Sequence, residues 1–112
     1  MHEMGVTKRI LATALERAHR EGMARIGAVT VEINPFSGID ADEVAECFAA
    51  ASQGTPAEGA ALTVREMAFS GRCRACGAEV AVTGPDARCA CDSTDIELAP
   101  LQDWRLAAVE VA

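Results

Sequence analysis

Four of the chain's five cysteines lie within nineteen residues and form the pattern best able to do chemistry. Cys73 and Cys76 have the CxxC spacing, which lets two thiolates bind one metal ion, and Gly77 allows a left-handed backbone there. Cys89 and Cys91 follow with the tighter CxC spacing. Tetrahedral Zn–S bonds of about 2.3 Å place sulfurs about 3.8 Å apart, which one intervening residue can span. The pattern predicts structural zinc bound by four cysteines; a redox dithiol and a degenerate site are the alternatives.

His2 is the other residue whose position could bind a metal. The α-amino group of residue 1, the peptide nitrogen and imidazole of His2, and the amide of Glu3 lie within chelating distance of one ion. Planar nitrogen coordination suits Ni(II) or Cu(II). Without further context, the residues favour an accidental surface histidine at a frayed terminus, with metal binding as the alternative.

The charge and composition of the 112-residue chain exclude several classes of protein. Ten Lys and Arg stand against seventeen Asp and Glu, and the net charge of −7 disfavours nucleic-acid binding. No stretch approaches the roughly 20 apolar residues of a membrane span, and the N-terminus is not typical of a secretory signal. With membrane and secreted proteins set aside, we expect a cytoplasmic protein, and in such a reducing compartment close thiol pairs indicate a metal before a disulfide.

The motifs do not indicate an enzyme. No Walker loop and no Ser/His/Asp set is visible, so the chain is not expected to hydrolyse GTP or to turn over a substrate. The segment 70–99 holds three arginines against five acids, and this charge would repel phosphate. We therefore expect the cysteine cluster to fix shape or to serve as a docking face.

Two helices are expected before the cysteines. Residues 3–21 place apolar side chains on one face and charged side chains on the other, the pattern of an amphipathic helix. Asp40 and Glu43 have the spacing of a helix cap with a reciprocal carboxylate. Gly54 and Pro56 end the helix that follows.

The remaining pattern predicts a sheet. Alternating apolar residues predict strands at 28–33 and 60–67, and composition indicates a third at 104–111. The cysteine-rich segment has only a short apolar run at 80–82 and cannot build a core alone. We predict an α+β fold: two helices on a three-stranded mixed sheet, with a small Cys-rich zinc lobe inserted before the last strand. The predicted domains are 1–69 plus 101–112 and, between them, 70–100.

Taken together, these motifs and predicted elements resemble a known family over nearly the whole chain. Five segments match in order and spacing: Met1-His2-Glu3-Met4, Val31 to Asp40, Phe48 to Leu62, the first cysteine knuckle Cys73 to Gly77, and Gln102 to Leu106. The family is the hydrogenase nickel-incorporation metallochaperones of the HypA type. The resemblance implies a two-lobed α+β protein with nickel at the N-terminus and structural zinc in a separate lobe.

The resemblance also assigns roles to residues. His2 becomes the nickel ligand, together with the backbone nitrogens of His2 and Glu3. Asp40 matches an acidic residue that some members place near nickel, and a pure helix cap is the equal alternative. The zinc ligands correspond to Cys73, Cys76, Cys89 and Cys91.

The implied partners are a hydrogenase maturation GTPase and the precursor of the [NiFe]-hydrogenase large subunit; some members also serve urease. Neither nucleic acid nor a membrane is an expected partner, and a homo-oligomer is allowed. The alternative function is a zinc-stabilised protein-interaction module that carries no nickel.

Two departures from the family pattern stand out. The second knuckle is normally CxxC followed by Gly, whereas this chain has Cys89-Ala-Cys91 followed by Asp92. The pair Asn34-Pro35 also replaces the Gly that is common near the end of the first strand, so we expect a stiffer turn there.

Overall fold

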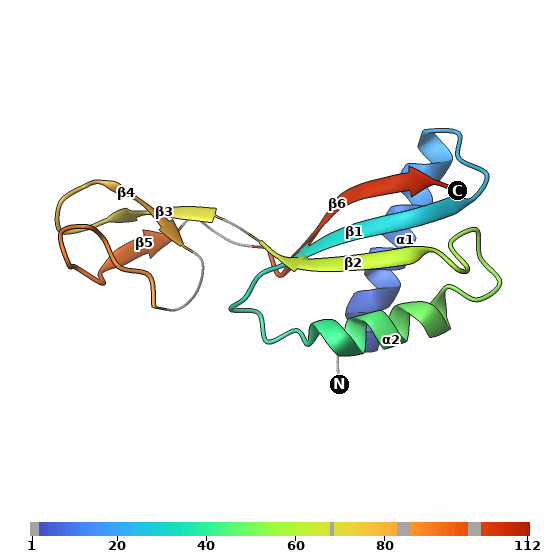
Figure 1. Cartoon of the computed structure of the whole chain (residues 1–112), viewed down its shortest axis with the longest axis horizontal. Coiled ribbons are helices and arrows are strands. Elements are labelled where there is room, and N and C mark those ends of the chain that lie inside the picture. Colours follow the sequence, from blue (N-terminus) through green and yellow to red (C-terminus); the bar gives the residue numbers. More distant parts are fainter. Residues whose placement is uncertain (1–2, 68, 83–85, 99–101) are drawn as a thin grey trace.

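A computed structural model describes residues 3–67, 69–82, 86–98 and 102–112, which form two helices and six strands. In chain order the elements are α1 (Glu3–Arg20), β1 (Ile26–Ile33), α2 (Ala41–Ala51), β2 (Ala61–Glu66), β3 (Phe69–Cys73), β4 (Glu79–Val82), β5 (Ile96–Leu98) and β6 (Trp104–Val111). The molecule measures 52 × 30 × 18 Å, with both helices beside one sheet and a second sheet at the far end (Figure 1). Neither described helix has the length and apolar character needed to cross a membrane.

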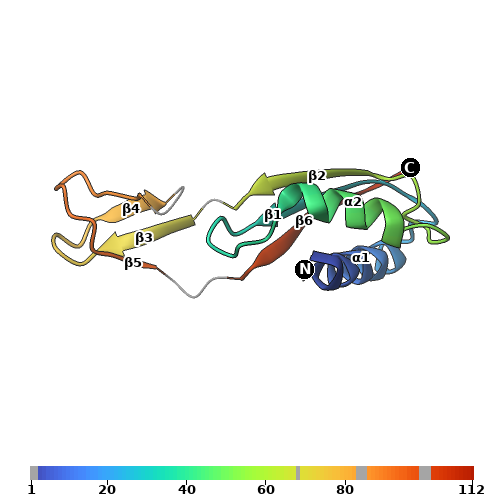
Figure 2. The same cartoon turned by 90° about the horizontal axis from the view of Figure 1, so that it is seen from below.

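The larger sheet has the strand order β2-β1-β6. β1 runs parallel to β2 and antiparallel to β6, so the sheet is mixed. α2 connects β1 to β2, because two parallel strands need a crossover between them, and both helices cover the same face (Figure 2). After β2 the chain forms the three strands of the smaller sheet, and β6 then completes the larger sheet. The predicted fold, two helices on a three-stranded mixed sheet with a Cys-rich lobe before the last strand, is confirmed.

Apolar side chains between the helices and this sheet form the main core. In β1 every second residue from Val29 to Ile33 is buried, because successive side chains of a strand point to opposite faces. Ile10 and Ala14 of α1 are buried in the same cluster, as are Val44 and Phe48 of α2. This packing holds the two helices side by side, so it sets where their first turns meet.

The element boundaries differ slightly from the predicted ones. β1 begins two residues before the predicted start at 28, β2 is one residue shorter at each end than 60–67, and β6 has the predicted bounds. The short strands β3, β4 and β5 were not predicted, because each is too short to show a clear run of alternating apolar residues.

The cysteine-rich lobe consists of β3, β4, β5 and the segments between them. Its sheet has the order β4-β3-β5, with both pairs antiparallel. The buried cluster contains Cys73, Val80 and Cys89, with Ile96 packed against it. So little apolar surface cannot hold a sheet together alone, as the composition predicts. The division into domains at residues 70 and 100 stays a prediction.

A carboxylate on the central strand connects all three strands of the larger sheet. Glu32 of β1 accepts hydrogen bonds from the guanidinium groups of Arg105 on β6 and of Arg65 on β2, the latter at 3.1 Å. Its side chain is only 13% exposed, whereas both arginines are more than half exposed. The hydrogen bond from Arg105, reinforced by the one from Arg65, lowers the pKa of Glu32 below its ordinary value.

Replacing Glu32 by glutamine should lower stability at neutral pH but not in acid. The lowered pKa means that folding favours the ionised carboxylate, so its contribution is complete above the unfolded value of 4.5 and is lost as the pH falls through the folded value. We expect Glu32→Gln to lower the free energy of unfolding by about 1 kcal/mol at pH 7, measured by urea titration.

The matched control is Glu110→Gln. Glu110 is an exposed carboxylate of β6 that has no ion pair among the described residues, so this variant should unfold like the wild type at both pH values. A deficit in Glu32→Gln that persisted unchanged in acid would contradict the ionic explanation.

Candidate metal centre

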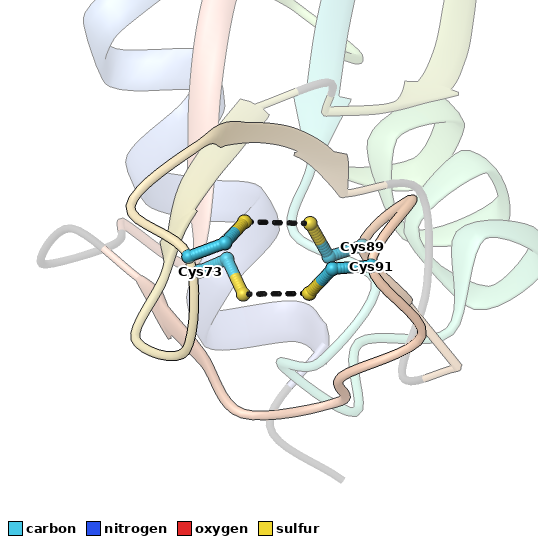
Figure 3. Close-up of side chains that lie close together, drawn as sticks. Cys73, Cys89 and Cys91 are labelled. Carbon is cyan, nitrogen blue, oxygen red and sulfur yellow. Dashed lines mark hydrogen bonds between the residues drawn. The ribbon is translucent and has the colours of Figure 1, made fainter.

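The structure brings the four clustered cysteines together in the cysteine-rich lobe. Cys73 ends β3 and Cys76 lies in the turn that follows, whereas Cys89 and Cys91 come from the segment before β5. Their sulfur atoms all lie within 4.8 Å of one another. Cys73 Sγ is 3.6 Å from Cys91 Sγ, and Cys76 Sγ is 3.5 Å from Cys89 Sγ. Figure 3 shows Cys73 facing Cys89 and Cys91 across the small gap between the two segments.

The first knuckle closes as its spacing predicts. Gly77 has a φ of +81°, its N–H donates to the carbonyl of Cys73 at 2.8 Å, and the N–H of Cys73 donates to Ala78. Glycine tolerates this left-handed conformation without a steric cost. The turn therefore presents Cys73 and Cys76 to the same side.

The second knuckle reaches the same geometry by a shorter route. The N–H of Asp92 donates to the carbonyl of Cys89 at 2.8 Å, and the N–H of Cys89 donates to Ser93 at 2.9 Å. Asp92 has a φ of +78°, the left-handed region that Asp tolerates better than most residues. Asp92 thus does for the CxC half what Gly77 does for the CxxC half. Asp92, directly after Cys91, is the sequence feature from which this turn could have been predicted.

This donor set fits zinc. The closest sulfur pairs approach the roughly 3.8 Å that tetrahedral Zn–S bonds impose. Four thiolates leave no coordination position for water or substrate, which is typical of a structural site. Cys73 and Cys89 are buried and the other two thiols are exposed, so one side of the cluster belongs to the core of the lobe.

The thiol pKa values show how closely the four groups interact. The backbone N–H of Cys76, helped by that of Ala75, outweighs burial and lowers the pKa of Cys73 to about 6. The backbone N–H of Ala78 favours the Cys76 thiolate, but the neighbouring thiols Cys89, Cys91 and Cys73 raise its pKa to about 12. Ionising all four thiols together is costly without a cation between them, and a divalent metal removes that cost.

The predicted nickel site is only partly within the described residues. His2 lies outside them, as does residue 1. Glu3 is the first residue of α1, and its side chain is buried. Its Oε2 accepts a hydrogen bond from the backbone N–H of Asp40 at 3.1 Å. The structure therefore brings together Glu3 and Asp40, two residues that the resemblance links to nickel.

Asp40 caps α2, as predicted. It has an extended conformation, and its Oδ1 accepts from the N–H groups of Asp42 at 2.9 Å and Glu43 at 3.2 Å. The reciprocal carboxylate predicted at Glu43 is wrong, because the N–H of Asp40 donates to Glu3 instead. Glu3 is buried where the helices meet and reaches this donor, whereas Glu43 is exposed.

Removing one thiol of the second knuckle should remove zinc. Cys89→Ser should lower the zinc content from one ion per chain to none, measured by metal analysis of the purified protein. Hydrogen exchange should then show lost protection in β3, β4 and β5, while the helices and the larger sheet keep theirs, because they have a separate core.

Cys47→Ser provides the control. Cys47 is a half-buried thiol on α2 outside the cluster, so this variant should keep its zinc. Wild-type protein that carried no zinc and four rapidly reacting thiols would show the CxC half to be defective.

Comparison with known proteins agrees with this geometry. Residues 1–111 match the family described as "Hydrogenase/urease nickel incorporation, metallochaperone, hypA". The hydrogenase maturation factor HypA of Trichormus variabilis is 38% identical over 111 residues, covering 99% of this chain and 96% of that protein. The HypA of Chlorobaculum tepidum is 37% identical over 89 residues, covering 80% and 79% of the two chains.

A solved structure shares the fold. The solution structure of the Ni metallochaperone HypA from Helicobacter pylori superimposes with a TM-score of 0.69 at 22% identity, covering 99% of this chain and 97% of that one. The family match spans almost the whole chain, and both relatives are identical to it at more than a third of the aligned residues. The chain therefore belongs to the HypA family of hydrogenase/urease nickel-incorporation metallochaperones.

Proposed function

We propose that this chain carries nickel for the maturation of [NiFe]-hydrogenase, binding Ni(II) at Met1–Glu3 and passing it on with a partner GTPase. The observation that carries this proposal is the hydrogen bond between Glu3 and Asp40, which joins the start of the chain to the cap of α2. The ligands proposed are the imidazole of His2 with the backbone nitrogens of His2 and Glu3. The precursor of the hydrogenase large subunit is the proposed recipient, in the cytoplasm, and no turnover of the chain's own is proposed.

The position of Glu3 suits nickel binding at its backbone nitrogen. Glu3 is the first residue of α1, and the N–H groups of a first turn have no carbonyl acceptor within their helix. A metal can therefore replace this amide proton without breaking a bond of the helical ladder. Binding releases protons, so nickel affinity should rise with pH.

Asp40 can cap α2 and face a metal at the same time. Its Oδ1 accepts both capping hydrogen bonds, and Oδ2 has no hydrogen-bond partner among the described residues. Asp40 is exposed, and its backbone N–H donates to the first residue of α1. The two interpretations of Asp40, cap and nickel ligand, are therefore compatible, and we propose that it does both.

The four clustered cysteines are the proposed zinc ligands, and their zinc has a structural role. Such a site holds the cysteine-rich lobe in shape at a distance from the carrier site. Raw affinity cannot select nickel, because the same nitrogens bind Cu(II) more tightly. Metal supply and contact with the partner must provide the selectivity.

Nickel titration of untagged protein tests this function. His2→Ala should lower nickel affinity by more than about 100-fold in calorimetry, because even changes to groups behind a ligand cost about 10–100-fold. Its zinc content and thermal melting should match the wild type. The matched control is His19→Ala, which removes the exposed histidine at the other end of α1. Equal affinity in wild type and His2→Ala would overturn the proposal and leave the zinc-stabilised interaction module.

Asp40→Asn separates the two proposed roles of this residue. Asparagine caps helices as well as aspartate does, so stability should stay near that of the wild type. Loss of the charged oxygen should weaken nickel binding by about tenfold, within the range for groups next to a metal site.

Two further variants complete this test. Asp40→Ala should show the same nickel defect together with a loss of about 1 kcal/mol from the missing cap. Asp42→Asn changes the neighbouring exposed carboxylate and should bind nickel like the wild type. Unchanged nickel affinity in Asp40→Asn would limit Asp40 to capping.

A further inference from the structure

The unpaired cations of this acidic chain are concentrated on α1. Each basic residue outside α1 donates to a carboxylate or a carbonyl of the protein: Arg25, Arg65, Arg72, Arg74, Arg88 and Arg105. The four basic residues of α1 have no such partner within the described ranges: Lys8, Arg9, Arg17 and Arg20. In a chain of net charge −7, this is the surface left to attract an anionic group.

Two of these arginines border a groove between α1 and β6. The groove has a volume of about 550 Å³ and is lined by Arg9, Thr13 and Arg17 on one side and by 102–106 on the other. Arg9, Thr13 and Arg17 are four residues apart, so they follow one another along the same side of the helix. The other wall includes the half-buried Trp104, whose ring supplies apolar surface.

The second wall of the groove is also an open sheet edge. β6 is the outer strand of the larger sheet and pairs on its inner side with β1 (Figure 1). The carbonyl of Asp103 accepts a hydrogen bond from the N–H of Asn34, directly after β1, at 2.9 Å. The backbone groups of Asp103 therefore point inward, toward β1. Backbone groups of a strand alternate, so the N–H and C=O of Trp104 point outward. An open edge with such groups is a template for another strand.

From the unpaired arginines, the groove and the open edge together, we infer that an extended acidic segment of a partner protein docks here. It adds as a fourth strand beside β6, and its carboxylates face Arg9 and Arg17. Main-chain hydrogen bonds supply affinity and alternate side chains supply specificity, as in other strand additions. The inference uses no residue of the proposed nickel site and does not rest on it.

The surroundings favour an acidic peptide over a nucleic acid. Arg105 already donates to Glu32, and the acidic residue Asp103 lines the groove itself. Few positive charges of the groove therefore lack a neighbouring acidic residue. A peptide with a carboxylate at every second residue matches two arginines, whereas a long polyanion would be repelled by the rest of the chain.

Trp104 provides a built-in reporter, because it is the chain's only tryptophan and tyrosine is absent. The full-length, zinc-loaded protein is titrated with a decapeptide of alternating Glu and Thr while the fluorescence of Trp104 is followed. We expect a saturable change that weakens as salt is added. A decapeptide of alternating Lys and Thr should produce none. Equal binding of the two peptides would overturn the inference.

Charge-matched variants locate the site. Arg9→Gln with Arg17→Gln should lower affinity for the Glu-Thr peptide by about fivefold to tenfold, as expected for two exposed ion pairs. Lys8→Gln with Arg20→Gln removes the same charge from the same helix but leaves the groove lining intact, and it should stay within about twofold of the wild type. Circular dichroism and melting verify that both variants fold. Equal losses in the two would overturn docking in this groove.

Peptide chemistry tests strand addition separately from charge. Two Glu-Thr peptides are N-methylated, one at every Glu and the other at every Thr, so each loses the N–H groups along one edge. One of them should lose binding, because only one edge faces β6. Full binding by both, or tighter binding of a ten-nucleotide oligothymidylate, would overturn the inference. His2→Ala should bind the Glu-Thr peptide normally, so failure of this inference and failure of the nickel proposal are distinguishable.

Discussion

One hydrogen bond, from the N–H of Asp40 to the carboxylate of Glu3, joins the first turn of α1 to the cap of α2. A buried carboxylate needs donors, and Glu3 finds one at the first turn of the other helix. The positive end of the α2 dipole lies at the same place and favours negative charge there. The interaction joins Glu3 to a residue far along the sequence, so the first turn of α1 is held against α2.

The two lobes are stabilised in different ways. The helix–sheet lobe buries a continuous apolar cluster between three strands and two helices. Among the described residues, the cysteine-rich lobe buries only Val80 and Val82 besides Cys73 and Cys89, so its sheet depends on the thiol cluster. Backbone turns at Gly77 and Asp92 aim the four sulfurs at one point. The lobe is thus shaped by metal-site geometry as much as by apolar burial.

Sequence reasoning succeeded where the signal is local and periodic. The amphipathic pattern of α1 and the alternation in β1 identified both elements, and the CxxC spacing identified the first half of the cysteine cluster. Contacts between distant segments could not be read in this way. The acceptor for the N–H of Asp40 comes from another helix, and a local capping rule suggested Glu43 instead. The left-handed Asp92 was missed because Asp adopts this conformation far less often than Gly, so Asp92 does not indicate a turn as Gly77 does.

The larger sheet contains a strand, β6, that follows the whole cysteine-rich lobe in the chain. During synthesis the sheet therefore stays incomplete until β6 is released, although both helices and two of its strands are already available. The intervening segment acts as a loop whose closure costs entropy, and a longer flexible loop costs more. A metal ion held by the two cysteine knuckles shortens that loop. Zinc supply would then influence how quickly the distant helix–sheet lobe is completed.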